Sequence, residues 1–287
     1  KNAVMMCGFY TEWILSKILP TMNPNWKLLL QEAADLCQET GQFIASQRRQ
    51  VSGNQVEVKS LNSLVSYVDQ EAERRLVEGL SKIYPEAGFI TEEETVAQER
   101  KEWNWIIDPL DGTTNFLFDL PIFAVSVALY QGDRPQLGIV YEVGQDEMFT
   151  AAAGMGAWCN DRPIKVSDES EFSKTLLATG FPYYDFDRLE PFNKLLAHCY
   201  THTRGVRRLG SAATDLAYVA AGRFNGYFEY GLSPWDVAAG ILLVQEAGGK
   251  VTNFSAGPDA VFSGEIVASA DAIFNEFQGL VAEYMLP

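Results

Sequence analysis

Residues 105–116 have the sequence WIIDPLDGTTNF, in which a short apolar run is followed by two aspartates. The apolar residues predict a buried strand that ends at Asp108, and Gly112 predicts a turn before the Thr-Thr-Asn run. A strand end followed by a glycine turn and a helix N-terminus exposes backbone N–H groups, which favours an anion. Asp108 and Asp111 would repel that anion unless divalent cations lay between them. Carboxylate oxygens suit Mg²⁺ and Mg²⁺ suits phosphate, so the stretch suggests a metal-bridged phosphate site.

Other acidic segments could complete such a site, although each has an ordinary structural explanation. Aspartate beside glycine is common in plain turns, which is the alternative for residues 108–112. Residues 89–94, FITEEE, place Glu92 after a predicted strand, where a run of acids can equally be a solvated surface. Asp236 stands in the first turn of the helix predicted after a Ser-Pro pair, and Asp69 opens another helix. An acid in a first turn complements the helix dipole whatever the function, so neither aspartate is specific alone.

The rest of the chain alternates helical and strand patterns without an internal repeat. Apolar residues at spacings of three and four predict helices, the first capped by Asn25, over residues 26–44, 69–83, 187–202, 210–222, 234–247 and 271–285. Runs rich in branched and aromatic residues predict strands over residues 88–90, 105–108, 122–130, 136–143, 147–152, 176–181, 225–230 and 265–269. These patterns predict an α/β (α+β) fold of two lobes that meet near residues 160–175, the most loop-like part of the chain.

The chain of 287 residues has a formal net charge of −16, which bears on its partners. Nonspecific contact with nucleic acid or an anionic membrane requires a basic face, so neither is expected. An anionic substrate is not excluded, because bound divalent cations reverse the local charge. The four cysteines form no CxxC pair and are typical of free thiols in a reducing compartment. Residues 1–21 are too short and too charged to span a membrane. They favour an irregular N-terminal extension, with a poor signal peptide as the alternative, so we expect a cytoplasmic protein.

Three separated segments, FITEEE at 89–94, WIIDPLDGTTNF at 105–116 and SPWDVAAGILLVQEAGG at 233–249, carry a family resemblance. In this order they resemble the signatures of the inositol monophosphatase family. The resemblance extends over about residues 25–285. It implies a layered αβαβα sandwich of the sugar phosphatase type, a homodimer and inhibition by Li⁺.

The resemblance also implies a metal site divided between two lobes. An N-terminal lobe, residues 22–165, would carry the main metal site, and a C-terminal lobe, residues 166–287, would complete the metal and substrate sites. The matching ligands for two or three Mg²⁺ ions are Glu92, Asp108, the backbone carbonyl of Leu110, Asp111 and Asp236.

The remaining matches concern water and substrate. The residues that would position the attacking water are Glu92, Thr113 and Asp69. Backbone donors to the phosphate would come from Gly112 and Thr113. The wall that receives the inositol hydroxyls would comprise Gly210, Ser211, Ala212, Glu229 and Asp236.

The implied activity is Mg²⁺-dependent hydrolysis of inositol monophosphate, or of a similar polyol or sugar monophosphate. Water attacks phosphorus in line with the leaving alkoxide, and cations stabilise charge at both ends, so no histidine base is required. His198 and His202 have the spacing of a helical metal pair, but no acid of matching register accompanies them, which favours an ordinary surface helix. The alternatives are fructose-1,6-bisphosphatase, 3'(2'),5'-bisphosphate nucleotidase, histidinol phosphatase, or a non-catalytic regulatory or binding protein.

Overall fold

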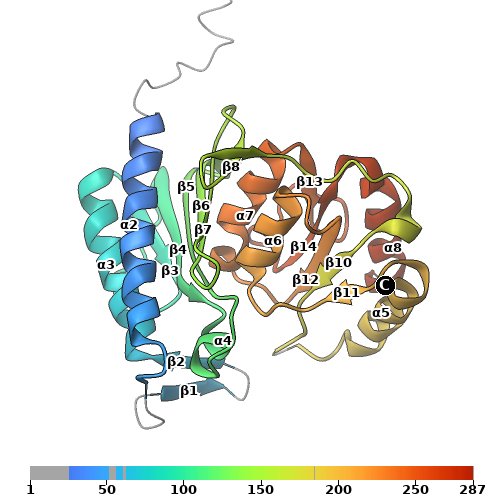
Figure 1. The fold of residues 1–287 in the computed structure, drawn as a ribbon, viewed down its shortest axis with the longest axis horizontal. Coiled ribbons are helices and arrows are strands. Elements are labelled where there is room, and N and C mark those ends of the chain that lie inside the picture. Colours follow the sequence, from blue (N-terminus) through green and yellow to red (C-terminus); the bar gives the residue numbers. More distant parts are fainter. Residues whose placement is uncertain (1–25, 52–55, 61–62, 184, 287) are drawn as a thin grey trace, which may run out of the picture.

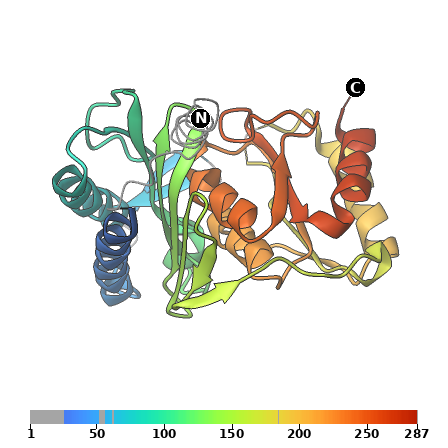
Figure 2. The ribbon, with the colours of Figure 1, turned by 90° about the horizontal axis from the view of Figure 1, so that it is seen from above.

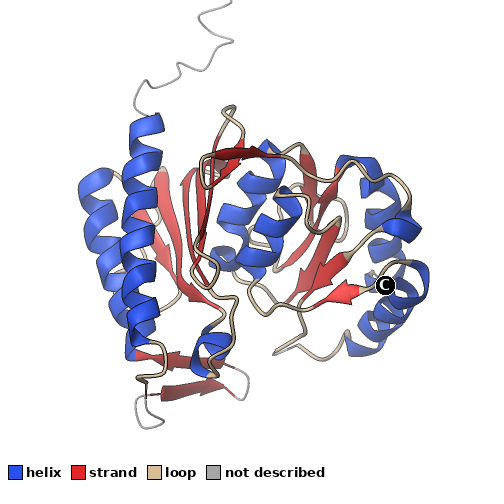
Figure 3. Cartoon of the chain, viewed as in Figure 1, coloured by secondary structure: helices blue, strands red, loops and turns tan. Residues whose placement is uncertain are grey.

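The computed structural model describes residues 26–51, 56–60, 63–183 and 185–286, and these form five stacked layers (Figure 1). Figure 3 shows that layers of helices and layers of strands alternate across the molecule. The expected αβαβα sandwich is therefore confirmed. The predicted extension over residues 1–21 and the predicted cap at Asn25 lie outside the described residues.

The helices form three of the layers. The outer layer on one side consists of α2 (Trp26–Gln47) and α3 (Tyr67–Ile83), and the middle layer of α6 (Ala212–Ala220) and α7 (Pro234–Glu246) (Figure 2). The other outer layer consists of α5 (Leu189–His202) and α8 (Phe274–Met285). Among the described residues, a five-residue helix and two 3-10 helices lie in the connections: α4 (Thr113–Leu117), η2 (Phe172–Lys174) and η3 (Asp271–Ile273). No helix in the described part of the chain is long and apolar enough to cross a membrane.

The larger sheet has seven strands in sequential order: β3 (Gly88–Thr91), β4 (Trp103–Asp111), β5 (Ala124–Gln131), β6 (Arg134–Glu142), β7 (Glu147–Ala152), β8 (Ala157–Cys159) and β9 (Arg162–Ile164). Only the β3–β4 pair is parallel, and Thr91 lies opposite Ile107. The carboxyl ends of these two strands therefore meet at one edge of the sheet, which brings the segment after β3 next to the two aspartates of β4.

The smaller sheet has five strands in the order β11 (Val206–Arg207), β10 (Leu177–Thr179), β12 (Gly226–Tyr230), β14 (Glu265–Ala270) and β13 (Gly249–Thr252). Strand β10 is parallel to both β11 and β12, with Thr179 opposite Phe228. The carboxyl ends of β10 and β12 therefore lie side by side, and they bring Gly180 next to Glu229. A separate hairpin consists of β1 (Val56–Ser60) and β2 (Ser63–Ser66).

Apolar side chains fill the spaces between the layers. Strand β4 points Trp105 and Ile107 towards α2 and α3, and Ile106 towards the middle helices. A strand covered on both faces reads as a continuous apolar run, which is why residues 105–107 lack alternation. The middle helices contact both sheets, so the predicted division at residue 165 stays a prediction, although the larger sheet ends at Ile164 and the smaller begins at Leu177.

Several predicted boundaries were wrong, each for a local physical reason. Strand β4 continues past Asp108 to Asp111, because a bulge lets residues 109 and 110 face one residue of β5. Helix α3 begins at Tyr67 rather than Asp69, because the Ser66 side chain caps it. Residues 160–175, predicted as the most loop-like part of the chain, contain the strand β9. Strand β13, which was not predicted, follows the turn at Gly248 directly. These strands have three or four residues, too few for a period to show.

Candidate active site

A cavity of about 360 Å³ lies where the two sheets and the middle helices meet. Every residue predicted for metal, phosphate or polyol contacts lines it: Glu92, Asp108, Leu110, Asp111, Gly112, Thr113, Gly210, Ser211, Ala212, Glu229 and Asp236. These residues come from five separated parts of the sequence. The structure therefore brings the predicted residues together, while their roles stay predictions.

The bulge at the end of β4 aims the two aspartates. Pro109 has no N–H for the ladder, and the Leu110 N–H turns instead to Asp108 Oδ1, at 2.9 Å. Gly112 follows with a φ of +92°, and a β-carbon there would lie 3.1 Å from the carbonyl oxygen of Ile122. Another side chain at position 112 would be both strained and crowded, so only glycine fits this turn.

Thr113 lies in a hydrogen-bonded chain that starts in α3. Its hydroxyl is 2.9 Å from Asp69 Oδ1 and 3.0 Å from the carbonyl oxygen of Leu110. The other oxygen of Asp69 accepts from the N–H of Ser66, at 2.8 Å, and from its hydroxyl, at 2.7 Å. Asp69 does not line the cavity but reaches it through Thr113, which matches the predicted pairing of these two residues.

The segment that carries Glu92 is held by a residue that sequence reasoning missed. Glu73 is fully buried and accepts from the N–H of Glu93, from the N–H of Thr95 and from the Thr95 hydroxyl, all within 2.7 Å. It lies one helical turn after Asp69, on the buried face of α3. Two acids four residues apart in an otherwise apolar stripe were the sequence signal for a second buried carboxylate.

Asp111, at the end of β4, connects the larger sheet to the start of α6 across the cavity. Its Oδ2 accepts from the hydroxyl of Ser211 and from the N–H of Ala213, both at 2.7 Å, at the start of α6. Asn115 makes a second connection, because its side-chain amide donates to the carbonyl oxygen of Leu209 at 2.8 Å. The predicted substrate contact of Ser211 is therefore a contact with Asp111 in this structure.

Asp236 is held at the first turn of α7. Its Oδ2 accepts from the N–H of Ser233, at 2.7 Å, which fixes the carboxylate at the helix N-terminus. The hydroxyl of Ser126 in β5 donates to the carbonyl oxygen of Trp235 at 3.2 Å and ties this turn to the larger sheet. The ordinary role of a first-turn acid and a role in the cavity therefore occur together.

Burial and mutual repulsion disfavour the charged forms of the clustered acids. Burial raises the pKa of Asp108 well above its usual range, and the charges of Glu92, Asp111 and Asp236 raise it further. The pKa of Asp236 is raised by burial and then by Asp111 and Glu92. Burial raises the pKa of Asp111 to about 6, although hydrogen bonds from Ser211 and the start of α6 oppose the rise. Positive charge placed among these acids would relieve the repulsion.

The donor set fits Mg²⁺ by type, because it consists of carboxylate oxygens and one backbone carbonyl. As they stand, no three His, Cys, Asp or Glu side chains in the described residues are arranged to hold a metal ion. Asp111 and Asp236 instead accept backbone and hydroxyl hydrogen bonds from the starts of α6 and α7. The printed hydrogen bonds end on Oδ2 of each aspartate, so they do not exclude cation binding by the same carboxylates.

The far wall of the cavity contains the predicted Glu229 together with residues that the sequence did not predict. Glu229 accepts from the hydroxyl of Tyr227 and lies against Gly180, where a β-carbon would overlap its carboxylate. Asp215, buried in α6, and Arg208 and Tyr183 also line the cavity. Asp215 stood in the sequence as an acid amid the small apolar residues of α6, which was a usable signal. The sequence around Arg208, Tyr183 and Gly180 did not indicate that these residues line the cavity.

The two histidines lie on α5, in an outer layer, and neither lines the cavity. Their rings stack 4.1 Å apart, and Nδ1 of His198 is 3.3 Å from the hydroxyl of Tyr284. No acid joins them in the described part of the chain as a metal-binding group. The interpretation of this pair as part of an ordinary surface helix stays a prediction.

The model of the inositol monophosphatase family matches residues 25–285. The chain belongs to the inositol monophosphatase family. Among similar proteins, the Nus factor SuhB of Pasteurella multocida (strain Pm70) is 40% identical over 261 residues, which cover 89% of this chain and 94% of that protein. The inositol-1-monophosphatase of Mesorhizobium japonicum is 40% identical over 246 residues, with coverage of 85% and 92%.

A solved structure shows the same fold. The extragenic suppressor protein suhB from Bartonella henselae superposes with a TM-score of 0.84 at 37% identity, covering 88% of this chain and 98% of that one. Membership of the inositol monophosphatase family therefore rests on the sequence match and on the layered fold together. The family match spans all segments that line the cavity.

Proposed function

We propose that the protein is a Mg²⁺-dependent phosphatase that hydrolyses inositol monophosphate or a similar small polyol phosphate. The observation that best supports this is the convergence of Glu92, Asp108, Asp111 and Asp236 on one cavity beside Thr113. Four acids in one partly closed site are costly unless cations offset them. The name of the relative from Mesorhizobium japonicum, inositol-1-monophosphatase, agrees with this substrate class.

The acids would hold the cations and so shape the phosphate end of the cavity. When bound, Mg²⁺ would supply positive charge that stabilises the attacking and leaving oxygens of an in-line displacement. The ligands that we assign to two or three ions are Glu92, Asp108, the carbonyl oxygen of Leu110, Asp111 and Asp236. The backbone N–H groups of Gly112 and Thr113 would donate to the phosphate oxygens.

Thr113 would orient the attacking water. Its own proton is directed to Asp69 or to the carbonyl oxygen of Leu110, so the hydroxyl oxygen can only accept from that water. A water that donates to Thr113 and to Glu92 keeps a lone pair for phosphorus. The new phosphorus–oxygen bond forms as the ester bond breaks, and a proton from the water passes to the leaving alkoxide.

A panel of substrates tests this assignment. Phosphate release is measured from myo-inositol 1-phosphate, fructose 1,6-bisphosphate, adenosine 3',5'-bisphosphate and histidinol phosphate, each with Mg²⁺ and with EDTA. We expect Mg²⁺-dependent release, fastest from the inositol phosphate. Faster phosphate release from another compound would change the proposed substrate to that compound. If none of the four compounds released phosphate, the proposed phosphatase activity would be contradicted.

A regulatory or binding role is the second candidate, because the similar protein of Pasteurella multocida is named a Nus factor. The retention of all five predicted ligand positions favours the enzyme. We further propose that the protein is a cytoplasmic homodimer. The free thiols of Cys37, Cys159 and Cys199 agree with a reducing compartment.

A further inference from the structure

Arg208 is the one basic residue among the described residues that line the acidic cavity. It follows the short strand β11 and precedes the Gly210 turn into α6. A β-carbon at Gly210 would lie 2.7 Å from Nη1 of Arg208, so the guanidinium lies directly over this turn. It lines the same cavity as Glu229.

The guanidinium is only partly used by the protein. One nitrogen, Nη2, donates to the hydroxyl of Tyr183, and the guanidinium carbon lies 5.7 Å from the ring centres of Phe181 and Tyr183. The Nε atom is buried and has no hydrogen-bond partner among the described residues. A buried guanidinium donor without a partner is costly, so a ligand that accepts from it would stabilise the site.

The charges around Arg208 indicate which ligand it suits. Its positive charge lowers the pKa values of Glu229, Asp215 and Asp111, although burial raises each of them more strongly, so all three acids lie within its electrostatic range. A second phosphate at this wall would meet those acids. A hydroxyl-bearing ligand instead finds a donor in Arg208 and an acceptor in Glu229, which suits groups that both donate and accept.

We infer that Arg208 adds a donor to the polyol wall beside Glu229, the acceptor that the family resemblance implies, and so selects substrates with neighbouring hydroxyls. Arg208 donates to one hydroxyl oxygen, and Glu229 accepts from the next hydroxyl. Tyr183 acts as a positioning residue, because its hydroxyl accepts from Nη2 and so holds the guanidinium at the wall. This inference rests on the proposed phosphatase function and adds a specificity-determining residue to it.

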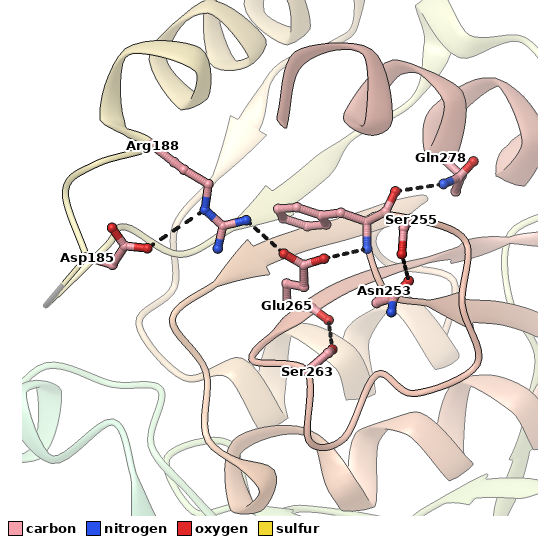
Figure 4. A network of polar contacts seen from close by, with 8 residues as sticks. Asp185, Arg188, Asn253, Ser255, Ser263, Glu265 and Gln278 are labelled. Carbon is pink, nitrogen blue, oxygen red and sulfur yellow. Dashed lines mark hydrogen bonds and ion pairs between the residues drawn. The ribbon is translucent and has the colours of Figure 1, made fainter. Parts of the chain in front are cut away.

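The residues that follow in the chain, Asp185 and Arg188, are linked to the smaller sheet by the network in Figure 4. Arg188 is 2.8 Å from the Glu265 carboxylate and 3.8 Å from Asp185, and its guanidinium carbon lies 4.4 Å from the Tyr230 ring centre. The other Glu265 oxygen accepts from the backbone N–H of Phe254 at 3.2 Å. This network links Asp185 and Arg188 to β14 and to β12, the strand that carries Glu229.

The test compares Arg208→Met with Arg207→Met. Methionine keeps the length of the stem but removes every donor. Arg207 is the adjacent basic residue, is exposed and does not line the cavity, so it is the matched control. Both variants are assayed with Mg²⁺ on myo-inositol 1-phosphate, on p-nitrophenyl phosphate, which lacks hydroxyls, and on fructose 1,6-bisphosphate.

We expect Arg208→Met to raise KM for the inositol phosphate about tenfold, as one lost hydrogen bond to a charged group would. Its kcat/KM for p-nitrophenyl phosphate should stay within about twofold of wild type, and Arg207→Met should match wild type on both. Tyr183→Phe, which removes only the positioning hydroxyl, should raise the same KM less. If Arg208→Met does not fold, the KM of Tyr183→Phe for the inositol phosphate tests the inference instead.

Three results would overturn the inference. Equal losses on both monophosphates would indicate a general structural role for Arg208. An unchanged KM for the inositol phosphate would show that Arg208 does not contact the polyol. A loss confined to fructose 1,6-bisphosphate would assign the guanidinium to a second phosphate. Wild-type protein that releases phosphate from none of these compounds would instead refute the proposed function.

Discussion

Glu229→Gln should make the protein more stable at alkaline pH in the absence of metal. Glu229 is only 7% exposed, and burial raises the pKa of its carboxyl from 4.5 to about 7, against the opposing hydrogen bond from Tyr227. Glutamine has nearly the same shape, and its amide oxygen can still accept from Tyr227. The substitution therefore removes the buried charge and changes the packing little.

The direction and size of the stability change follow from the raised pKa of Glu229. Below the unfolded pKa of 4.5, the carboxyl is protonated in both states and costs nothing; above about 7 it is ionised in both, and the folded state carries the full cost. A rise of about 2.5 pKa units corresponds to about 3 kcal/mol at 1.36 kcal/mol each. Wild-type stability should therefore fall by about this amount between these two pH values, relative to the variant.

Urea unfolding of both proteins in EDTA, at about pH 4.5 and about pH 8, measures the difference. Glu276→Gln, an exposed substitution of the same type on α8, is the control and should follow wild type at both pH values. A stability difference between Glu229→Gln and wild type that is the same at both pH values would refute the reasoning.

Three further predictions concern the supports of the cavity and its response to ions. Gly180→Ala should raise KM for inositol phosphate several-fold while sparing p-nitrophenyl phosphate, because the new methyl group displaces the Glu229 carboxylate; equal effects on both substrates would refute this. Glu73→Gln should cost about 1–3 kcal/mol in unfolding free energy and lower kcat, since an amide cannot accept all three hydrogen bonds. The exposed Glu78→Gln on the same helix should be nearly neutral, and equal effects of the two would contradict the role of Glu73. Millimolar Li⁺ should inhibit the Mg²⁺-saturated enzyme, and activity indifferent to Li⁺ would count against this branch of the family.

The long elements were predictable because their patterns extend over several turns or strands. Helix α3 shows its buried face in Ala72, Leu76 and Leu80, and its end before Pro85 was identified correctly. The left-handed Gly248 after α7 was also indicated, since glycine adopts that conformation without strain. The short strands β11 and β13 have too few residues for a period, and the pairing with their neighbours decides their structure.

The candidate site divides in the same way. Acids in recognisable segments, such as Asp108 and Asp236, were found because the segments themselves are distinctive. Glu73 accepts from the backbone N–H of Glu93, twenty residues along the chain. Arg208 reaches the cavity because of the path that the chain takes after β11. Neither role can be recognised from a short stretch of sequence. Contacts between separated segments are decided by packing, which a single sequence does not display.

The most direct test of the account is Mg²⁺-dependent phosphate release from myo-inositol 1-phosphate by wild type and by Asp108→Asn. Asp108 lies centrally among the acids, so its loss should disturb every proposed ion and lower turnover at least about 100-fold. Asp133→Asn, an exposed substitution in the turn between β5 and β6, should keep normal activity. Near-normal turnover of Asp108→Asn in Mg²⁺ would contradict the central claim that these carboxylates hold the catalytic cations.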